Sequence, residues 1–150
     1  MNNWCPTENE VINKAIEKLE SIGFNIISQC NTKQQGIDIE AEKNGIKLLI
    51  EAKGATSSME GSKRNGKPFN RNQARTHISV AIYKVMSLIS ELKNHNSLTL
   101  FGICLPFERN HIEFINNVKY SLDKLGVVIL WVKENDVLIE VNSEEVKEYF

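Results

Sequence analysis

The chain has 150 residues, of which 41% are hydrophobic and 25% are charged, the composition of an ordinary globular protein with one domain over residues 1–150. Its formal net charge of −1 excludes a strong overall field that attracts nucleic acid, so any such attraction must come from a local basic stretch. Three widely spaced cysteines without zinc-ligand spacing, an N-terminus unlike a signal peptide and no apolar run long enough for a bilayer predict a cytoplasmic protein without a membrane segment.

The first predicted helix begins after Thr7 and ends at Gly23. Thr7 as N-cap and Glu10 three residues later form a capping box, and glycine commonly ends a helix. Apolar residues recur between them at helical spacing, so we expect one buried face. The next segment, Phe24 to Cys30, has the pattern of a first strand.

Residues 36 to 53 predict a β-hairpin. The Asn44-Gly45 pair at its centre is the strongest local hairpin signal, because a type I′ turn needs a positive φ at both central residues. Such a turn pairs Lys43 with Ile46 and thereby sets the register of both strands.

In this register Asp38 lies directly opposite Glu51, on the face away from the predicted core. Like charges opposite each other destabilise a sheet, whereas a divalent cation between the two carboxylates reverses the sign of the interaction. Oxygen ligands of this kind suit Mg²⁺ or Mn²⁺. Lys53, two residues after Glu51, returns an ammonium group to the same face.

Asp38 followed by Glu51-Ala52-Lys53 resembles the active site of the PD-(D/E)XK nuclease superfamily, which has the restriction-endonuclease-like fold. In that pattern an acid is followed, after a gap, by acid-any-Lys at the end of an apolar strand. The residue before Asp38 is isoleucine instead of proline, a departure that the superfamily tolerates. The hairpin is most similar to that of the archaeal Holliday junction resolvases. The bland alternative is a solvated polar face on an edge hairpin.

The resemblance implies roles for four residues of the hairpin. Asp38, Glu51 and the backbone carbonyl of Ala52 are expected to bind one or two Mg²⁺ (or Mn²⁺) ions. Lys53 is expected to position or deprotonate the attacking water, or to neutralise charge on the phosphate.

The superfamily often adds a glutamate from the first helix to the metal site. The position where the resolvases carry it holds Ile12 here, so the match fails at that residue. Glu8, one helical turn earlier, is the better substitute and is our candidate metal ligand. Glu10 is expected only to cap the helix, although either acid is open as the additional ligand.

Residues 54 to 70 form the least regular stretch and include Lys63, Arg64 and Lys67. From Lys53 to His77 the chain carries six basic residues and one acid, a basic stretch directly after the candidate site. Two interpretations stay open: a loop that closes over a phosphate backbone, or a mobile surface loop with ordinary lysines.

A second long helix is predicted from about Arg71 to Lys93. The superfamily resemblance gives Gln73 a supporting catalytic role, because many members carry a glutamine on this helix. Arg71, Arg75 and the helix N-terminus together suit a phosphate. His77 either contacts phosphate as well or has a structural role.

The rest of the chain predicts a strand at 98–106, a helix at 109–125, strands at 127–132 and 137–141, and a short terminal helix at 143–149. The predicted fold class is therefore α/β, with a mixed central sheet flanked by helices. The core order is α-β-β-β-α-β, followed by a C-terminal α-β-β-α extension. The resemblance identifies this order as restriction-endonuclease-like.

These patterns favour an Mg²⁺-dependent endonuclease that hydrolyses DNA phosphodiester bonds, of a restriction, repair or phage-defence type. The alternatives are a catalytically silent nucleic-acid-binding or structural protein on the same fold, and a nuclease directed at RNA. Both nucleic acids expose the same phosphodiester, so the pattern does not separate them. A homodimer is compatible with the sequence, and a membrane partner is not expected.

Overall fold

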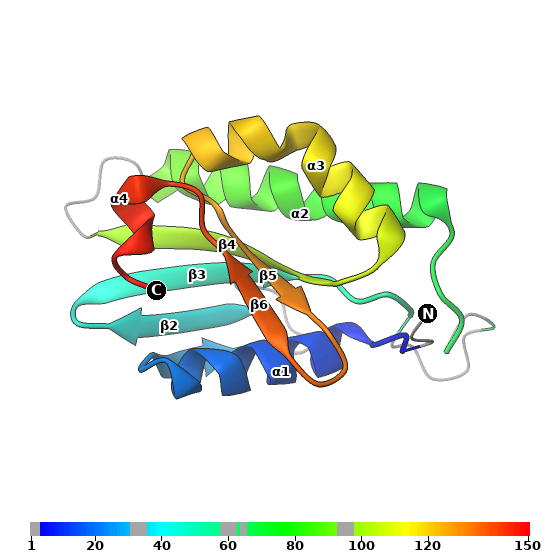
Figure 1. Ribbon diagram of the computed structural model, residues 1–150, viewed down its shortest axis with the longest axis horizontal. Coiled ribbons are helices and arrows are strands. Elements are labelled where there is room, and N and C mark those ends of the chain that lie inside the picture. Colours follow the sequence, from blue (N-terminus) through cyan, green and yellow to red (C-terminus); the bar gives the residue numbers. More distant parts are fainter. Residues whose placement is uncertain (1–3, 31–35, 58–62, 64–65, 93–97) are drawn as a thin grey trace.

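The computed structural model describes residues 4–30, 36–57, 63, 66–92 and 98–150. Within these ranges the chain forms a mixed α/β domain whose elements follow the predicted order (Figure 1). The elements are α1 (Glu8–Ser21), β1 (Asn25–Gln29), β2 (Ile39–Lys43), β3 (Ile46–Ala52), α2 (Arg71–Leu92), β4 (Thr99–Pro106), α3 (Arg109–Lys124), β5 (Val128–Val132), β6 (Val137–Glu140) and α4 (Glu144–Lys147).

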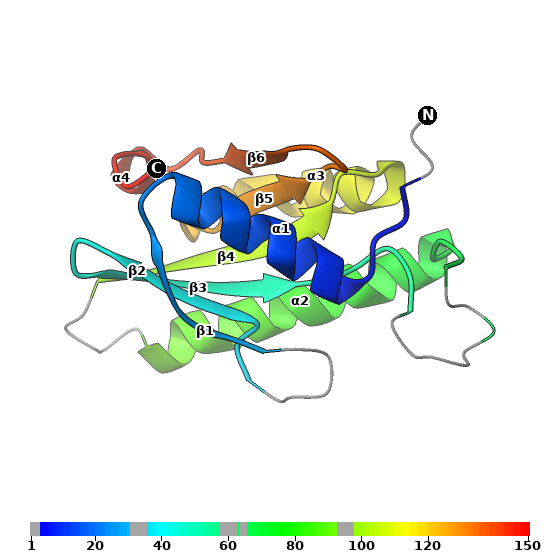
Figure 2. The ribbon, with the colours of Figure 1, turned by 90° about the horizontal axis from the view of Figure 1, so that it is seen from below.

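The six strands form one sheet in the order β1-β2-β3-β4-β5-β6. The β1, β2 and β3 strands pair antiparallel, β3, β4 and β5 pair parallel, and β6 returns antiparallel to β5. α1 covers one face of this sheet, and α2 and α3 cover the other (Figures 1 and 2). The predicted class, a mixed sheet flanked by helices, is therefore confirmed.

The strands at the centre of the sheet are buried on both faces. In β5, Val128 and Leu130 belong to the core under α1, whereas Ile129 and Trp131 belong to the core under α2 and α3. Period-2 alternation sends successive side chains to opposite faces, so a strand covered on both sides must be apolar at every position. This explains the continuous apolar run in the sequence.

The β2–β3 hairpin has the predicted turn and register. Asn44 has φ +52° and Gly45 has φ +79°, both in the left-handed region that a type I′ turn needs. The strands pair from Lys43 with Ile46 to Ile39 with Ile50, as the sequence predicted. The ladder stops there, so Asp38 lies just outside β2.

No helix among the described residues is both long enough and apolar enough to cross a membrane. Predicted and observed boundaries differ by one or two residues at several ends, which is the usual fraying of helices and strands, and the hairpin begins at Ile39, three residues later than predicted. Residue 93, the predicted end of the second helix, lies outside the described residues.

Candidate functional site

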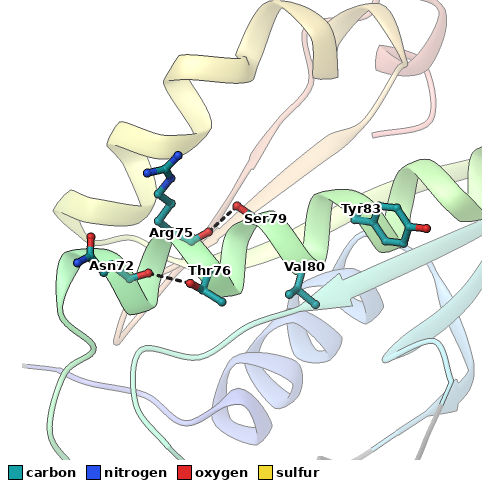
Figure 3. A pocket seen from close by; sticks show the side chains of 6 residues that line it. All are labelled: Asn72, Arg75, Thr76, Ser79, Val80 and Tyr83. Carbon is teal, nitrogen blue, oxygen red and sulfur yellow. Dashed lines mark hydrogen bonds between the residues drawn. The ribbon is translucent and has the colours of Figure 1, made fainter.

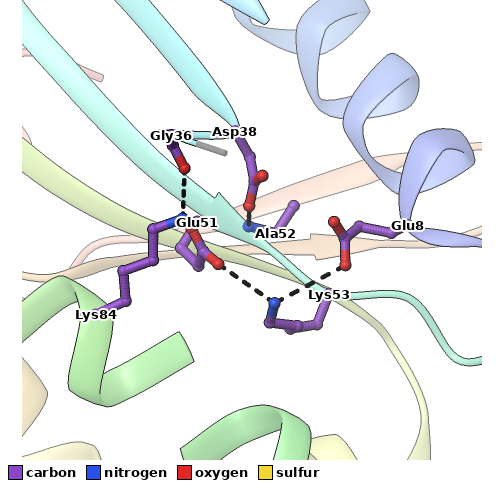
Figure 4. A network of polar contacts seen from close by, with 7 residues as sticks. All are labelled: Glu8, Gly36, Asp38, Glu51, Ala52, Lys53 and Lys84. Atoms are coloured by element: carbon purple, nitrogen blue, oxygen red, sulfur yellow. Dashed lines mark hydrogen bonds and ion pairs between the residues drawn. The ribbon is translucent and has the colours of Figure 1, made fainter. Parts of the chain in front are cut away.

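Five charged side chains meet where β3 ends, beside the start of β2 and the first turn of α1 (Figure 4). Three are acids, Glu8, Asp38 and Glu51, and two are lysines, Lys53 and Lys84. The two hairpin acids are almost fully buried, with 7% of Asp38 and 3% of Glu51 exposed. Buried charges are costly unless they are paired, so this group needs a structural or a functional explanation.

The side chain of Asp38 accepts a hydrogen bond from β3 at a position where β2 no longer pairs with it. Its Oδ2 accepts a hydrogen bond of 2.8 Å from the Ala52 amide, which extends beyond the last ladder pair of β2 and β3. Its own backbone carbonyl accepts a hydrogen bond of 2.9 Å from the Cys30 amide. These two hydrogen bonds hold the backbone and the side chain of Asp38, so its carboxyl group lies at the end of β3.

Burial raises the pKa of Asp38 from its ordinary value to about 7. The hydrogen bond from the Ala52 amide opposes this shift, while the charge of Glu51 and a side-chain hydrogen bond with it add to the shift. Two carboxyl groups in contact cannot both ionise without cost, and this repulsion adds to the effect of burial on the pKa of Asp38. The opposition of Asp38 and Glu51 predicted from the hairpin register is thus present as direct contact.

Each carboxylate oxygen of Glu51 faces a different lysine. Oε1 lies 3.3 Å from Lys53 Nζ, and Oε2 lies 2.6 Å from Lys84 Nζ. The approach of Lys84 is an ion pair of poor hydrogen-bond angle, since Oε2 is buried and no well-aligned donor among the described residues reaches it. The Lys84 ammonium is the cation that this buried carboxylate oxygen meets among the described residues.

Glu8 reaches the site because the backbone after β3 lies against the start of α1. The Ala55 amide donates a hydrogen bond of 2.8 Å to the Pro6 carbonyl. A Cβ atom at Gly54 would lie 2.4 Å from the Glu8 backbone nitrogen, so only glycine permits this approach. The Glu8 carboxylate then lies 3.8 Å from Lys53 Nζ.

Burial raises the pKa of Glu8; the charge of Lys53 opposes this shift and the charge of Glu51 adds to it. Glu8 therefore belongs electrostatically to the site. Glu10 instead completes the predicted capping box, because its side chain accepts a hydrogen bond of 2.7 Å from the Thr7 amide.

Lys84 is a member of the site that the sequence reasoning missed. It lies in the middle of α2 and also donates a hydrogen bond of 2.5 Å to the Gly36 carbonyl. Burial lowers the pKa of Lys84, but the contact with Glu51 and the charges of Asp38 and Glu8 outweigh burial and raise it. The available signal was its place on α2, three residues after the buried Ala81.

The donor set fits a hard divalent cation. Three carboxylates supply oxygen ligands, and the Ala52 carbonyl points to the same side of β3 as the amide that meets Asp38. Within the described ranges, no three metal-binding side chains yet converge closely enough to hold an ion. The two ammonium groups lie among the acids and neutralise them, so a bound ion requires these side chains to move together.

Gln73 and Arg71 have other partners in the structure. The Gln73 side-chain oxygen accepts a hydrogen bond of 2.9 Å from the Asn70 amide, and the Asn70 side chain accepts one of 2.9 Å from the Gln73 amide. This reciprocal cap begins α2. Arg71 pairs with Glu113 and lies 4.9 Å from the ring centre of Phe114, which joins α2 to α3. The catalytic role expected of Gln73 and the phosphate role expected of Arg71 therefore gain no support from these contacts.

His77 stacks on Phe69 with a centroid distance of 4.3 Å. Burial lowers its pKa, and the nearby positive charges of Lys53 and His111 lower it further. The imidazole is therefore mainly neutral near pH 7, and a phosphate contact there would be a hydrogen bond without a full positive charge.

Three of the remaining predicted nucleic-acid contacts lie on exposed surface. Arg75 is on the outer face of α2, where it lines a shallow hollow of about 570 Å³ (Figure 3). Lys63 and Lys67 line a second hollow of about 410 Å³ beside the α2 cap. Arg64 lies outside the described residues, as does part of the 54–70 stretch.

No protein-family model matches the chain, and no curated protein does. Solved structures share its fold, among them the following two. An XisH family protein from Nostoc punctiforme PCC 73102 aligns with TM-score 0.51 and 19% identity over 90% of this chain and 98% of its own. An fdxN element excision controlling factor protein from Anabaena variabilis aligns with TM-score 0.51 and 19% identity over 89% of this chain and 96% of its own. At this identity the likeness concerns the fold alone.

Proposed function

We propose that this protein is a metal-dependent endonuclease that hydrolyses DNA phosphodiester bonds on a restriction-endonuclease-like fold. The observation that carries the proposal is the meeting of two buried carboxyl groups, Asp38 and Glu51, with the Lys53 ammonium 3.3 Å from Glu51. The three residues come from the hairpin that matches the superfamily pattern. Glu8 adds a third carboxylate from α1.

The electrostatics of the site favour a divalent cation. Burial raises the pKa of Asp38 to about 7, and the charges of Glu51 and Glu8 add to the shift, so a cation beside these acids would favour the ionised form. Glu8, Asp38, Glu51 and the Ala52 carbonyl are the residues that would hold Mg²⁺ or Mn²⁺. The bound ion would supply a hydroxide near neutral pH and stabilise the charge that develops on the phosphate.

Lys53 has the position for work on the attacking water or the phosphate. Its side chain is 14% exposed, and its ammonium lies within ion-pair distance of both Glu8 and Glu51. From there it orients water or neutralises a phosphate oxygen. By resemblance to the superfamily, the expected products carry a 5′-phosphate and a 3′-hydroxyl.

DNA is the proposed substrate because exposed basic residues lie around the first turns of α2, the part of that helix where His77 feels the charge of Lys53. Lys63 and Lys67 precede α2 and Arg75 lies in its second turn. Phosphate contacts of this kind make binding weaken steeply as salt concentration rises. An RNA-directed nuclease uses the same site, and parallel assays on matched DNA and RNA strands distinguish the two.

The test is cleavage of plasmid DNA in Mn²⁺ by the wild type and by Asp38→Asn and Lys53→Met. Each variant is expected to lose activity on the order of 10²-fold or more, because each removes a group that acts on the reacting phosphate or water. Glu40→Gln is the matched control, since Glu40 is an acid of the same hairpin that pairs with Lys47 at the surface. Cleavage that persists in Asp38→Asn or Lys53→Met contradicts the proposal.

A catalytically silent binding protein gives a different result. It would retard DNA on a gel without cutting it and would bind no Mn²⁺ at millimolar concentration. Calorimetric titration of the wild type with Mn²⁺ therefore separates that function from the nuclease.

A further inference from the structure

The ammonium of Lys84 lies between two oxygen atoms of the kinds that bind metal cations. It is 2.6 Å from Glu51 Oε2 and 2.5 Å from the Gly36 carbonyl oxygen (Figure 4). A carboxylate oxygen and a backbone carbonyl oxygen are the kinds of ligand that hard divalent cations take in proteins. Lys84 therefore occupies a place where a small cation would find two oxygen ligands.

The backbone conformation of Gly36 directs its carbonyl oxygen toward Lys84. Gly36 has φ +143°, in the region that favours glycine, and its carbonyl faces a lysine 48 residues later in the chain. Lys84 reaches it from α2, across from the hairpin, with 35% of its side chain exposed. The contact therefore joins α2 to the segment that delivers Asp38.

Lys53 differs from Lys84 in its relation to Glu51. It belongs to the same strand end, and its Nζ lies 3.3 Å from the other carboxylate oxygen. Its second acidic neighbour is Glu8, at 3.8 Å. The two lysines thus lie on opposite oxygens of one carboxylate, and only Lys84 also contacts a backbone carbonyl among the interactions shown in Figure 4.

Charge favours one divalent ion over two. Without nucleic acid, three ionised carboxylates and two ammonium groups carry −1. One divalent ion brings this charge to +1 and a second would bring it to +3, in a site whose central acids are almost fully buried. Uncompensated buried charge is strongly unfavourable.

We propose that Lys84 is a positioning residue that holds one of two cation positions beside Glu51, so that the site takes one divalent ion instead of two. This rests on the proposed nuclease function and specifies its metal content. Lys84 keeps Glu51 oriented and leaves its other side, with Asp38, Glu8 and the Ala52 carbonyl, for the single ion.

The test is the number of Mn²⁺ ions bound per chain, measured without nucleic acid by calorimetry and by electron paramagnetic resonance of the free ion. The wild type and Lys84→Arg, which keeps the charge, are expected to bind one ion. Lys84→Gln keeps a hydrogen-bond donor for Gly36 but removes the charge, and it is expected to bind two. Lys84→Met provides a second uncharged variant if Lys84→Gln does not fold, with folding checked by circular dichroism.

Two controls separate position from charge alone. Lys53→Gln removes an ammonium from the other oxygen of Glu51, and Lys47→Gln removes one from a surface ion pair of the same hairpin. Both are expected to bind one ion. A second ion in Lys53→Gln would show that any nearby charge has the same effect, and this would overturn the assignment to Lys84.

The remaining outcomes distinguish this inference from the proposed function. Two ions in the wild type, or one ion in both uncharged Lys84 variants, overturn the role of Lys84 and leave the nuclease standing. No Mn²⁺ binding by the wild type or by any variant overturns the metal site, and the role of Lys84 with it.

Discussion

The two ends of the β2–β3 hairpin differ in the charged residues that they bring together. Near the turn, Lys47 and Glu40 form an exposed ion pair of opposite sign, with N···O 3.0 Å. At the open end, Asp38 and Glu51 place like charges in contact and almost out of water. The first arrangement is typical of a surface strand, whereas the second destabilises the sheet and is neutralised by lysines. Residues that cost stability at one end of an otherwise ordinary hairpin are the observation on which the proposed site rests.

The largest effect is expected where the open end meets α1. Gly54→Ala places a methyl group against the backbone of Thr7 and Glu8, at 2.7 and 2.4 Å, so the strand end and the helix must separate. We expect a loss of about 3 kcal/mol in the free energy of unfolding, measured in urea.

The matched change at the turn end is Gly45→Ala. A methyl group there meets nothing within 4 Å, so the cost comes only from the positive φ of +79°. We expect about 1 kcal/mol. Equal losses at the two glycines would show that the close approach to α1 is not what positions the open end.

An intermediate effect is expected from pH. The pKa of Asp38 is about 7 in the folded protein against an ordinary value of 3.8, so between these values the folded state binds more protons than the unfolded state. Stability therefore falls as pH rises through this window and levels off above it. Asp38→Asn should remove that part of the slope and be more stable than the wild type at pH 8, by on the order of 2 kcal/mol.

The measurement is urea unfolding of both proteins at pH 5 and pH 8, without metal. Groups far from Asp38 titrate equally in the two proteins, so the difference reports Asp38 together with the groups that feel its charge, such as Lys84. A wild type that is as stable as Asp38→Asn at pH 8 would refute the buried, repelled carboxyl group.

The smallest effect is expected at the surface pair. Lys47→Ala removes a lysine whose side chain is 49% exposed, and solvent screens most of its attraction to Glu40. We expect a change of about 0.5 kcal/mol or less in the free energy of unfolding. A larger loss would mean that the turn end, too, depends on its charges, and the contrast between the ends would weaken.

The parts of the site predicted from the sequence are those that local rules determine. The Asn44-Gly45 turn fixed the register, and the register brought Asp38 and Glu51 together. Helical periodicity put Glu8 on the inward side of α1, where it meets Lys53. The element order followed from the change between two-residue and helical periods along the chain.

The parts that were missed depend on contacts between distant segments. Lys84 meets Glu51 only because α2 packs across the sheet, and no local pattern aims a helical lysine at a given acid. Arg71 pairs with Glu113, 42 residues away, instead of remaining free for phosphate. The cap formed by Asn70 and Gln73 was visible in the sequence as a spacing of three residues before an apolar stripe. The family resemblance instead led to a predicted catalytic role for Gln73.

The spread of the five charged side chains along the chain also governs when the site can exist during synthesis. Glu8, the hairpin acids and Lys53 leave the ribosome before Lys84, and α2 packs against β4 and α3, which are made later still, as well as against β3. Contacts over such long sequence separations form late in folding. A nascent chain can thus bring Asp38 and Glu51 together in the local hairpin early, but Lys84 joins them only when α2 packs on the sheet.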